Sequence, residues 1–324
     1  MFWWREMGFA LAIAPIVEHG RRMKEPKTGM HTRYDVTMAL EAARNRVLLV
    51  PSPEHAVLRV TGKDRTTWLN GLVTCDLVAT RTRGEAVYGL AVRKNGRVLA
   101  DLVILVEPDE IFVVAARAAR DRLVDSLEHH LVMEDVAVEK SPLDVTFAYG
   151  PQAMASVSRA SGGFVASFDR FRVGGAVLVG ADVSLVGAEV GDEDVAETLR
   201  LEQGVPRFGV DFDETTYPQE AGLEKTAVSF SKGCYLGQEV VCMLAMRGRV
   251  TRRLVSLVLD GVPVRGAVVR DPAGDAVGEI TSAVASPTLG RAVALAMVKQ
   301  AYVEPGTRVQ VEGREALVVA SPCP

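Results

Sequence analysis

The sequence has few cysteines, no surplus of positive charge and no long hydrophobic run, and each shortage excludes a class of protein. Its 324 residues include four cysteines, without the CxxC pairs or Cys/His spacing of a structural zinc site. Scarce cysteine favours a reducing, cytoplasmic compartment. The net charge of −4 disfavours a dedicated nucleic-acid binder. With 48% hydrophobic and 24% charged residues, the composition is that of a globular protein.

Residues 1–29 are predicted to be an N-terminal extension outside the fold. Their apolar run, Met7 to Val17, is shorter than the roughly 20 residues that a membrane-spanning helix needs. The leading charges cancel and no small-residue cleavage site follows, which disfavours a secretory signal peptide. We therefore expect no membrane association, and we place the edge of the domain near Met30 or Met38.

Apolar patterns predict an α+β region over residues 30–250. An alternating strand runs into a short helix that Asp64 could cap. Two β-rich runs flank Asn95-Gly96, whose tolerance of positive φ suits a tight hairpin turn. A further helix, with acids at its start, is predicted to stop at Gly204.

The C-terminal part of the chain has a different pattern. From Arg252 onward, short apolar runs alternate with glycine, proline and aspartate, which is typical of antiparallel strands joined by turns. We therefore predict a small antiparallel β-barrel over residues 251–324.

The most informative string is KGCYLGQE, residues 232–239. Glycines on both sides of Cys234 permit tight turns, and the residues that follow could begin a helix. Unpaired N–H groups at a helix start and the nearby Lys232 would favour the thiolate, which suits a nucleophile, a redox sensor or a soft-metal ligand. A buried, inert cysteine in a tight loop is the alternative.

This octapeptide resembles the signature motif of the YgfZ family, folate-binding proteins linked to iron–sulfur cluster assembly and repair that are similar to the glycine cleavage T-protein. The resemblance extends from about Val57 to Val319, through RVTGKDRTTWLNGLVTCDL, NGRVLADLVIL and LRLEQGVPRFGVDFDETTYPQEAGL. It implies a T-protein-like fold of three parts, in which the α+β layers of two subdomains in residues 30–250 surround a channel and the terminal barrel closes it.

The resemblance also implies a site for tetrahydrofolate or a one-carbon derivative. A carboxylate can accept the adjacent N–H and amino group of a pterin, and the resemblance gives this role to Glu202. Asp101 matches the acid near the folate's reactive nitrogens, where it could orient the ligand or transfer a proton; an ordinary strand-edge acid is the alternative. Cys234 would lie reactive at the edge of the cavity. Further folate contacts are expected from the other motif residues, Lys232, Tyr235, Gly237, Gln238 and Glu239.

Four arginines lie within seven residues, at positions 247, 249, 252 and 253. Guanidinium groups match carboxylates, so Arg249 and its neighbours could hold the glutamate tail of a folate. An RNA contact and a solvated strand face are the alternatives. The acids between Asp211 and Glu224 lack the spacing of metal ligands, so we interpret them as solvated loop residues and predict no metal.

Three functions compete for this sequence. The first is a tetrahydrofolate-binding accessory factor for iron–sulfur assembly or repair, with client enzymes or assembly factors as partners. One cysteine cannot hold a cluster that typically takes about four protein ligands, so the protein itself is not expected to carry one. The second is an aminomethyltransferase, which the KGCYLGQE string and the N-terminal sequence disfavour. The third, a tRNA-binding or tRNA-modifying protein, is supported only by the arginine cluster.

Overall fold

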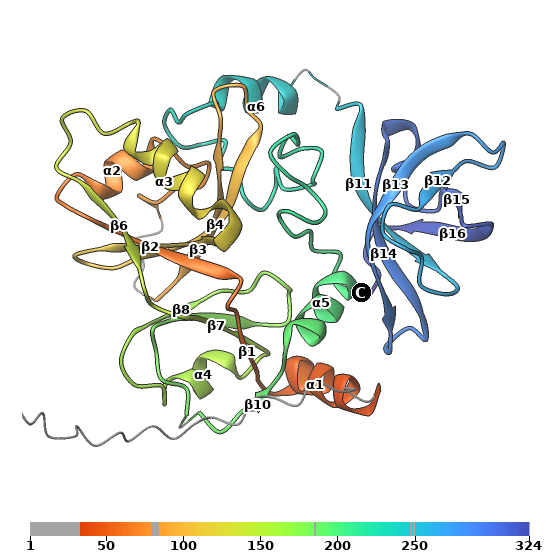
Figure 1. Cartoon of the computed structure of the whole chain (residues 1–324), viewed down its shortest axis with the longest axis horizontal. Helices are drawn as coiled ribbons and strands as arrows, with labels where there is room; N and C mark the ends of the chain where they lie inside the picture. The colour runs from red at the N-terminus through yellow and green to blue at the C-terminus, as the bar shows by residue number, and fades with distance from the viewer. Residues whose placement is uncertain (1–32, 80–83, 185, 247, 249, 324) are drawn as a thin grey trace, which may run out of the picture.

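The computed structural model describes residues 33–79, 84–184, 186–246, 248 and 250–323, so the predicted N-terminal extension lies outside the described residues. Their strands form two five-stranded sheets and one closed six-stranded barrel (Figure 1). The predicted fold class, α+β layers followed by an antiparallel barrel, is confirmed.

The first sheet has the strand order β3-β4-β5-β2-β6 and packs against two helices. Its elements are β2 (His55–Thr61), α2 (Arg65–Asn70), β3 (Ala86–Val92), β4 (Val98–Val106), β5 (Ile111–Ala116), η1 (Arg117–Ala119), α3 (Arg120–Glu128) and β6 (Ala137–Ser141). Gly96 has a φ of +76°, which confirms the hairpin predicted at Asn95-Gly96. The predicted cap is wrong, because Asp64 accepts the backbone N–H of Asp135 instead of one from α2.

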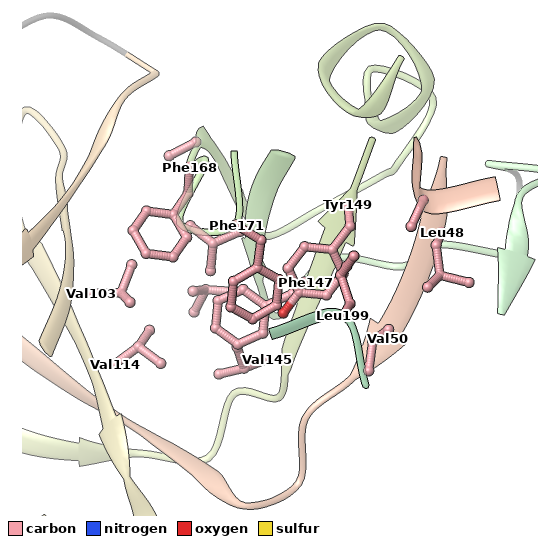
Figure 2. Packing of buried hydrophobic residues seen from close by; sticks show 14 of the residues in the cluster. Leu48, Val50, Val103, Val114, Val145, Phe147, Tyr149, Phe168, Phe171 and Leu199 are labelled. Atoms are coloured by element: carbon pink, nitrogen blue, oxygen red, sulfur yellow. The ribbon is translucent and has the colours of Figure 1, made fainter. Parts of the chain in front are cut away.

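The second sheet has the order β10-β1-β7-β9-β8. It and its helices comprise α1 (Arg33–Asn45), β1 (Leu48–Pro51), β7 (Val145–Tyr149), α4 (Ala153–Val157), β8 (Phe164–Ser167), β9 (Gly175–Val179) and β10 (Glu189–Val190). Side chains alternate along a strand, so one face of each sheet is free to meet the other. Val103 and Val114 of the first sheet share a core with Val50 and Phe147 of the second (Figure 2).

The barrel closes in the order β11-β14-β13-β12-β15-β16. Its elements are β11 (Arg252–Leu259), β12 (Val268–Arg270), β13 (Ala276–Ser286), β14 (Arg291–Lys299), η2 (Gln300–Tyr302), β15 (Arg308–Val311) and β16 (Arg314–Val319). Alternate residues of β14 pack in two different hydrophobic cores. Ala294 and Ala296 pack inside the barrel, whereas Val293 and Leu295 pack outside it against Leu201.

Helix α5 (Glu193–Glu202) lies between the sheets and the barrel (Figure 1). Asp192 caps it by accepting the backbone N–H of Val195, and Gly204 follows its end at a φ of +66°, as predicted. The chain then runs without regular structure to α6 (Gln238–Met246), which packs on the tip of the β3–β4 hairpin. Helix α5 therefore links the barrel to the layer between the two sheets.

Candidate functional site: a cavity between the two sheets

A cavity of about 370 Å³ lies between the two sheets and α5. Its lining comes from the β1–β2 link, β4, β5, β7, the segment between β8 and β9, α5 and residues 206–210. Small-molecule sites commonly have volumes of roughly 300–1,000 Å³ and apolar linings with a few polar groups. The size and the mixed lining of this cavity are therefore those of a ligand site.

Aromatic side chains form one wall of the cavity. Phe147 and Tyr149 are two residues apart on β7, which directs both to the same face. The Tyr149 ring stacks on Phe171, with centroids 4.7 Å apart and planes 15° apart, and Phe168 lies beside Phe147 (Figure 2). Flat, apolar surfaces of this kind favour stacking with a planar ring.

Asp101 is the acid that the structure places on the opposite side, in β4. Its Oδ2 accepts hydrogen bonds from the Tyr88 hydroxyl at 3.0 Å and from Arg170 Nη1 at 3.3 Å. Among the residues that the structure describes, none donates to Oδ1. The carboxylate is thus fixed in orientation and keeps one oxygen available to a ligand.

Arg170 holds this acid by reaching across from the segment between β8 and β9. Its Nη2 donates to the Tyr88 hydroxyl at 2.8 Å and to the carbonyl of Pro206 at 2.7 Å, and its guanidinium lies 4.1 Å from the centre of the Tyr88 ring. Burial raises the pKa of Tyr88 well above its ordinary value, so the hydroxyl stays a proton donor. Neither Arg170 nor Tyr88 was identified from the sequence, which has no local motif around them.

Glu202 lies outside the lining of this cavity, and its expected contact with the pterin stays a prediction. Its carboxylate is fully buried, with Oε2 paired to Arg44 of α1 and Oε1 accepting the hydroxyl of Ser286 of β13. Glu197, five residues earlier on α5, lines the cavity instead. Five residues turn an α-helix by about 140° beyond one full rotation, so the two acids point to different sides. Both oxygens of Glu197 accept hydrogen bonds from Arg200, so Glu197 is less open to a ligand than Asp101.

Comparisons with known proteins agree with this architecture. The model of the GCVT N-terminal domain matches residues 27–186, and that of the glycine cleavage T-protein C-terminal barrel domain matches residues 252–324. The mitochondrial aminomethyltransferase of Gallus gallus is 30% identical over 314 residues, which cover 82% of this chain and 78% of that protein. The chain belongs to the glycine cleavage T-protein family.

Two further relatives match this chain over most of its length. The aminomethyltransferase of Bordetella petrii is 31% identical over 301 residues, covering 82% of this chain and 80% of that protein. The solved structure of the glycine cleavage system aminomethyltransferase T from Bartonella henselae matches with a TM-score of 0.77 at 20% identity, over 89% of each chain. The T-protein-like fold expected from the sequence is therefore confirmed.

In this T-protein family member, the KGCYLGQE motif is separate from the cavity, and none of its residues lines it. Lys232 is buried, and its ammonium donates to the carbonyls of Asn70, Val73 and Cys75 at 2.5–2.9 Å. Those bonds fasten the motif to the loop after α2. The ammonium of Lys232 is therefore committed to the backbone, and its expected role beside a folate or the Cys234 thiol stays a prediction.

Tyr235 and Gly237 of the same motif lie in close packing contacts. Tyr235 is buried in a core with residues of β3 and β4. Gly237 has a φ of +76°, and a Cβ atom there would lie 2.4 Å from the carbonyl oxygen of Arg93. Gln238 and Glu239 form the first turn of α6. Tyr235 and Gly237 therefore hold the loop in place, and the expected folate contacts of all four residues stay predictions.

Cys234 is exposed on this fastened loop. The alternative of a buried, inert cysteine is therefore wrong, whereas Cys75 and Cys323 are buried. Burial raises the pKa of the Cys75 thiol to about 12, which keeps it protonated. Cys234 is accessible to a partner, but it does not line the cavity as expected. Its chemical role stays a prediction.

The arginine cluster is partly committed to ion pairs. Arg252 pairs with Glu220 at 3.0 Å, and Arg253 pairs with Glu224, while Arg249 lies outside the described residues. Glu220 is buried, and so is Asp211, which Arg200 and two hydroxyls of β13 contact. The interpretation of these two acids as solvated loop residues is wrong, since both connect the irregular segment to the barrel.

Neither a metal site nor a membrane-spanning helix is found among the residues that the structure describes. No group of three or more His, Cys, Asp or Glu side chains in that part of the chain could hold a metal ion. No helix within the same residues is long and apolar enough to cross a membrane.

Proposed function

We propose that the protein binds tetrahydrofolate or a one-carbon derivative in the cavity between the two sheets. The open Oδ1 of Asp101, opposite an aromatic wall, is the observation that carries the proposal. A reduced pterin is a flat ring with N–H and amino donors at its edge, so it matches both surfaces. Membership of the T-protein family supports the same ligand class.

Different residues of the cavity would have different roles in binding the folate. Asp101 accepts a ligand hydrogen, Arg170 and Tyr88 keep the carboxylate oriented, and the aromatic side chains exclude water from the ring. When bound, the folate would supply nitrogen atoms that carry a one-carbon unit.

Calorimetric titration with tetrahydrofolate and its 5-formyl analogue tests this proposal. Asp101→Asn should raise the dissociation constant at least about tenfold, because a hydrogen bond to a charged group contributes about 1.5–3 kcal/mol. Asp109→Asn is the matched control, since Asp109 is exposed in the turn of the same strand pair. Absence of saturable binding by the wild type would refute the proposal, and wild-type affinity in Asp101→Asn would move the site.

The finer part of the proposal is an accessory role in iron–sulfur assembly or repair. It is supported by the resemblance of KGCYLGQE to the YgfZ motif and by a loop that exposes Cys234 while Lys232 fastens it. Cys234→Ser should abolish complementation of an iron–sulfur enzyme defect and leave folate affinity unchanged. Cys242→Ser, on α6, is the control and should complement fully. Full complementation by Cys234→Ser would remove the thiol from the function.

An aminomethyltransferase is the second candidate, and the curated relatives named aminomethyltransferase favour it. Such an enzyme would transfer the one-carbon unit of a lipoyl-bound aminomethyl group to tetrahydrofolate, with release of ammonia and of the free lipoyl thiol. Incubation with both substrates decides between the candidates, because formation of methylenetetrahydrofolate would favour the enzyme. An RNA titration at physiological salt tests the tRNA hypothesis. Salt-sensitive RNA binding without folate binding would favour that hypothesis over both candidates.

A further inference from the structure

Three polar side chains on the cavity wall have no part in the function proposed above. Ser52, Glu54 and His55 lie in the link from β1 to the first residue of β2, and all three line the cavity. Ser52 is buried, whereas 26% of the His55 side chain and 41% of the Glu54 side chain are exposed. Ser52 Oγ lies 2.6 Å from Glu54 Oε1 and 2.8 Å from His55 Nδ1.

Counting hydrogens in this cluster fixes the tautomer of His55. Burial alone would raise the pKa of Glu54, but hydrogen bonds from His55 and Ser52 outweigh it and lower the pKa to about 2, so the carboxylate only accepts. The single hydroxyl hydrogen of Ser52 goes to Glu54 Oε1. The contact of Ser52 Oγ with His55 Nδ1 therefore needs its hydrogen from the ring. Glu54 Oε1, 3.4 Å from Nδ1, is a second acceptor for it.

With the proton on Nδ1, a neutral imidazole has a lone pair on Nε2. No residue in the described part of the chain forms a hydrogen bond with Nε2. The His55 ring packs edge-on to Phe147, with centroids 5.3 Å apart and planes at 72°. The ring is therefore held on the aromatic wall of the cavity with one acceptor nitrogen unused.

The strand register places His55 in the same row as Asp101. His55 pairs with Ala116, and Leu102 pairs with Ala115, so Asp101 falls beside Ala116 on the other side of β5. Neighbouring strands are about 4.8 Å apart, so the two Cα atoms lie about 10 Å apart. Residues in one row point to the same face, and both side chains line the cavity. A flat two-ring molecule with hydrogen donors on both edges suits acceptors at this spacing.

We propose that His55 is a second ligand contact, whose Nε2 accepts a hydrogen bond from an N–H or amino group of the reduced folate. Ser52 and Glu54 are positioning residues, which fix the Nδ1–H form of the ring. The identity of the ligand rests on the proposed function, whereas the hydrogen on Nδ1 rests on the hydrogen bonds of the protein alone.

Nitrogen-15 NMR of the ligand-free protein tests the state of the ring without any folate. The His55 Nδ1 resonance should appear in the protonated range and Nε2 in the unprotonated range. Ser52→Ala combined with Glu54→Leu should abolish this preference, whereas Ser52→Thr, which keeps a hydroxyl, should retain it; circular dichroism confirms folding of each. An Nε2–H ring in the wild type would overturn the proposal.

Titration with tetrahydrofolate tests the contact itself. His55→Leu should raise the dissociation constant about tenfold, and His55→Gln, which keeps an acceptor oxygen, should stay within about threefold of wild type. His129→Leu is the matched control, at an exposed histidine after α3. Folate should also shift the Nε2 resonance of the wild type. Absence of any folate binding would refute the proposed function, whereas binding that left both His55 readouts unchanged would overturn this contact alone.

Discussion

Two acids of this protein, Glu202 and Asp101, have opposite surroundings. Glu202 is completely buried, and Arg44 and Ser286 occupy both of its oxygens. Asp101 has one oxygen held by Arg170 and the other open to a cavity. A carboxylate with both oxygens occupied joins α1, α5 and the barrel, while a carboxylate with one free oxygen can still accept a ligand. We therefore expect the number of occupied carboxylate oxygens, rather than burial, to distinguish an acid that holds the fold from an acid that can bind a ligand.

The largest loss of stability is expected at Glu202, whose two carboxylate oxygens both have partners. Arg44→Leu would leave the Glu202 carboxylate buried without its counter-charge, which should lower the free energy of unfolding by about 3–5 kcal/mol. Urea denaturation measures this loss. Folate affinity of the folded fraction should be unchanged, because neither residue lines the cavity. A stability loss below about 1 kcal/mol would mean that water or another group replaces the arginine.

A smaller loss of stability and a larger loss of affinity are expected at the open acid. Arg170→Leu removes the donors to Asp101, to Tyr88 and to the Pro206 carbonyl, and should destabilise the protein by about 2 kcal/mol. Folate affinity should fall at least about tenfold, since the carboxylate loses its fixed orientation. Denaturation and calorimetry measure the two effects. Arg172→Leu is the neighbouring control, and equal effects in both variants would contradict the comparison.

The smallest effect is a pH dependence from Glu54 in the cavity wall. Its pKa is lowered from 4.5 to about 2, so its contribution to stability is fully present above pH 4.5 and is lost as the pH falls towards 2. Because the side chain is partly exposed, solvent screening limits this contribution to about 1 kcal/mol or less. The stability difference between wild type and Glu54→Gln should therefore shrink between pH 4.5 and 2. A constant difference across that range would contradict the hydrogen bonds assigned to Glu54.

Local sequence was sufficient for several structural predictions. The Asn95-Gly96 turn, the α5 helix with its Gly204 stop, and the α+β-then-barrel order are all confirmed. Each depends on interactions between residues close in the chain, or on a pattern of apolar residues that repeats within one element. The resemblance added the T-protein-like fold, which the family models bear out.

The candidate site was only partly accessible to the same reasoning. Asp101 was identified through the family resemblance of the hairpin strand, but Arg170 lies 69 residues away and reaches it from the second sheet. The link holding Ser52, Glu54 and His55 has no motif, because its chemistry depends on how these three side chains share two hydrogen atoms. The sequence of KGCYLGQE did not reveal that Lys232 donates its hydrogen bonds to backbone carbonyls.

The sequence by itself determined which segments become strands, helices and turns, and that a barrel follows an α+β region. Only the tertiary structure decided that Asp101 faces the cavity and that Glu202 does not. Helix α5 directs Glu202 towards α1 and the barrel, and the pairing of β4 with β5 and of β5 with β2 sets Asp101 in line with His55. The physical reason is that hydrogen-bond partners distant in the chain compete for each acid, and their positions are fixed only when the sheets and the barrel pack together.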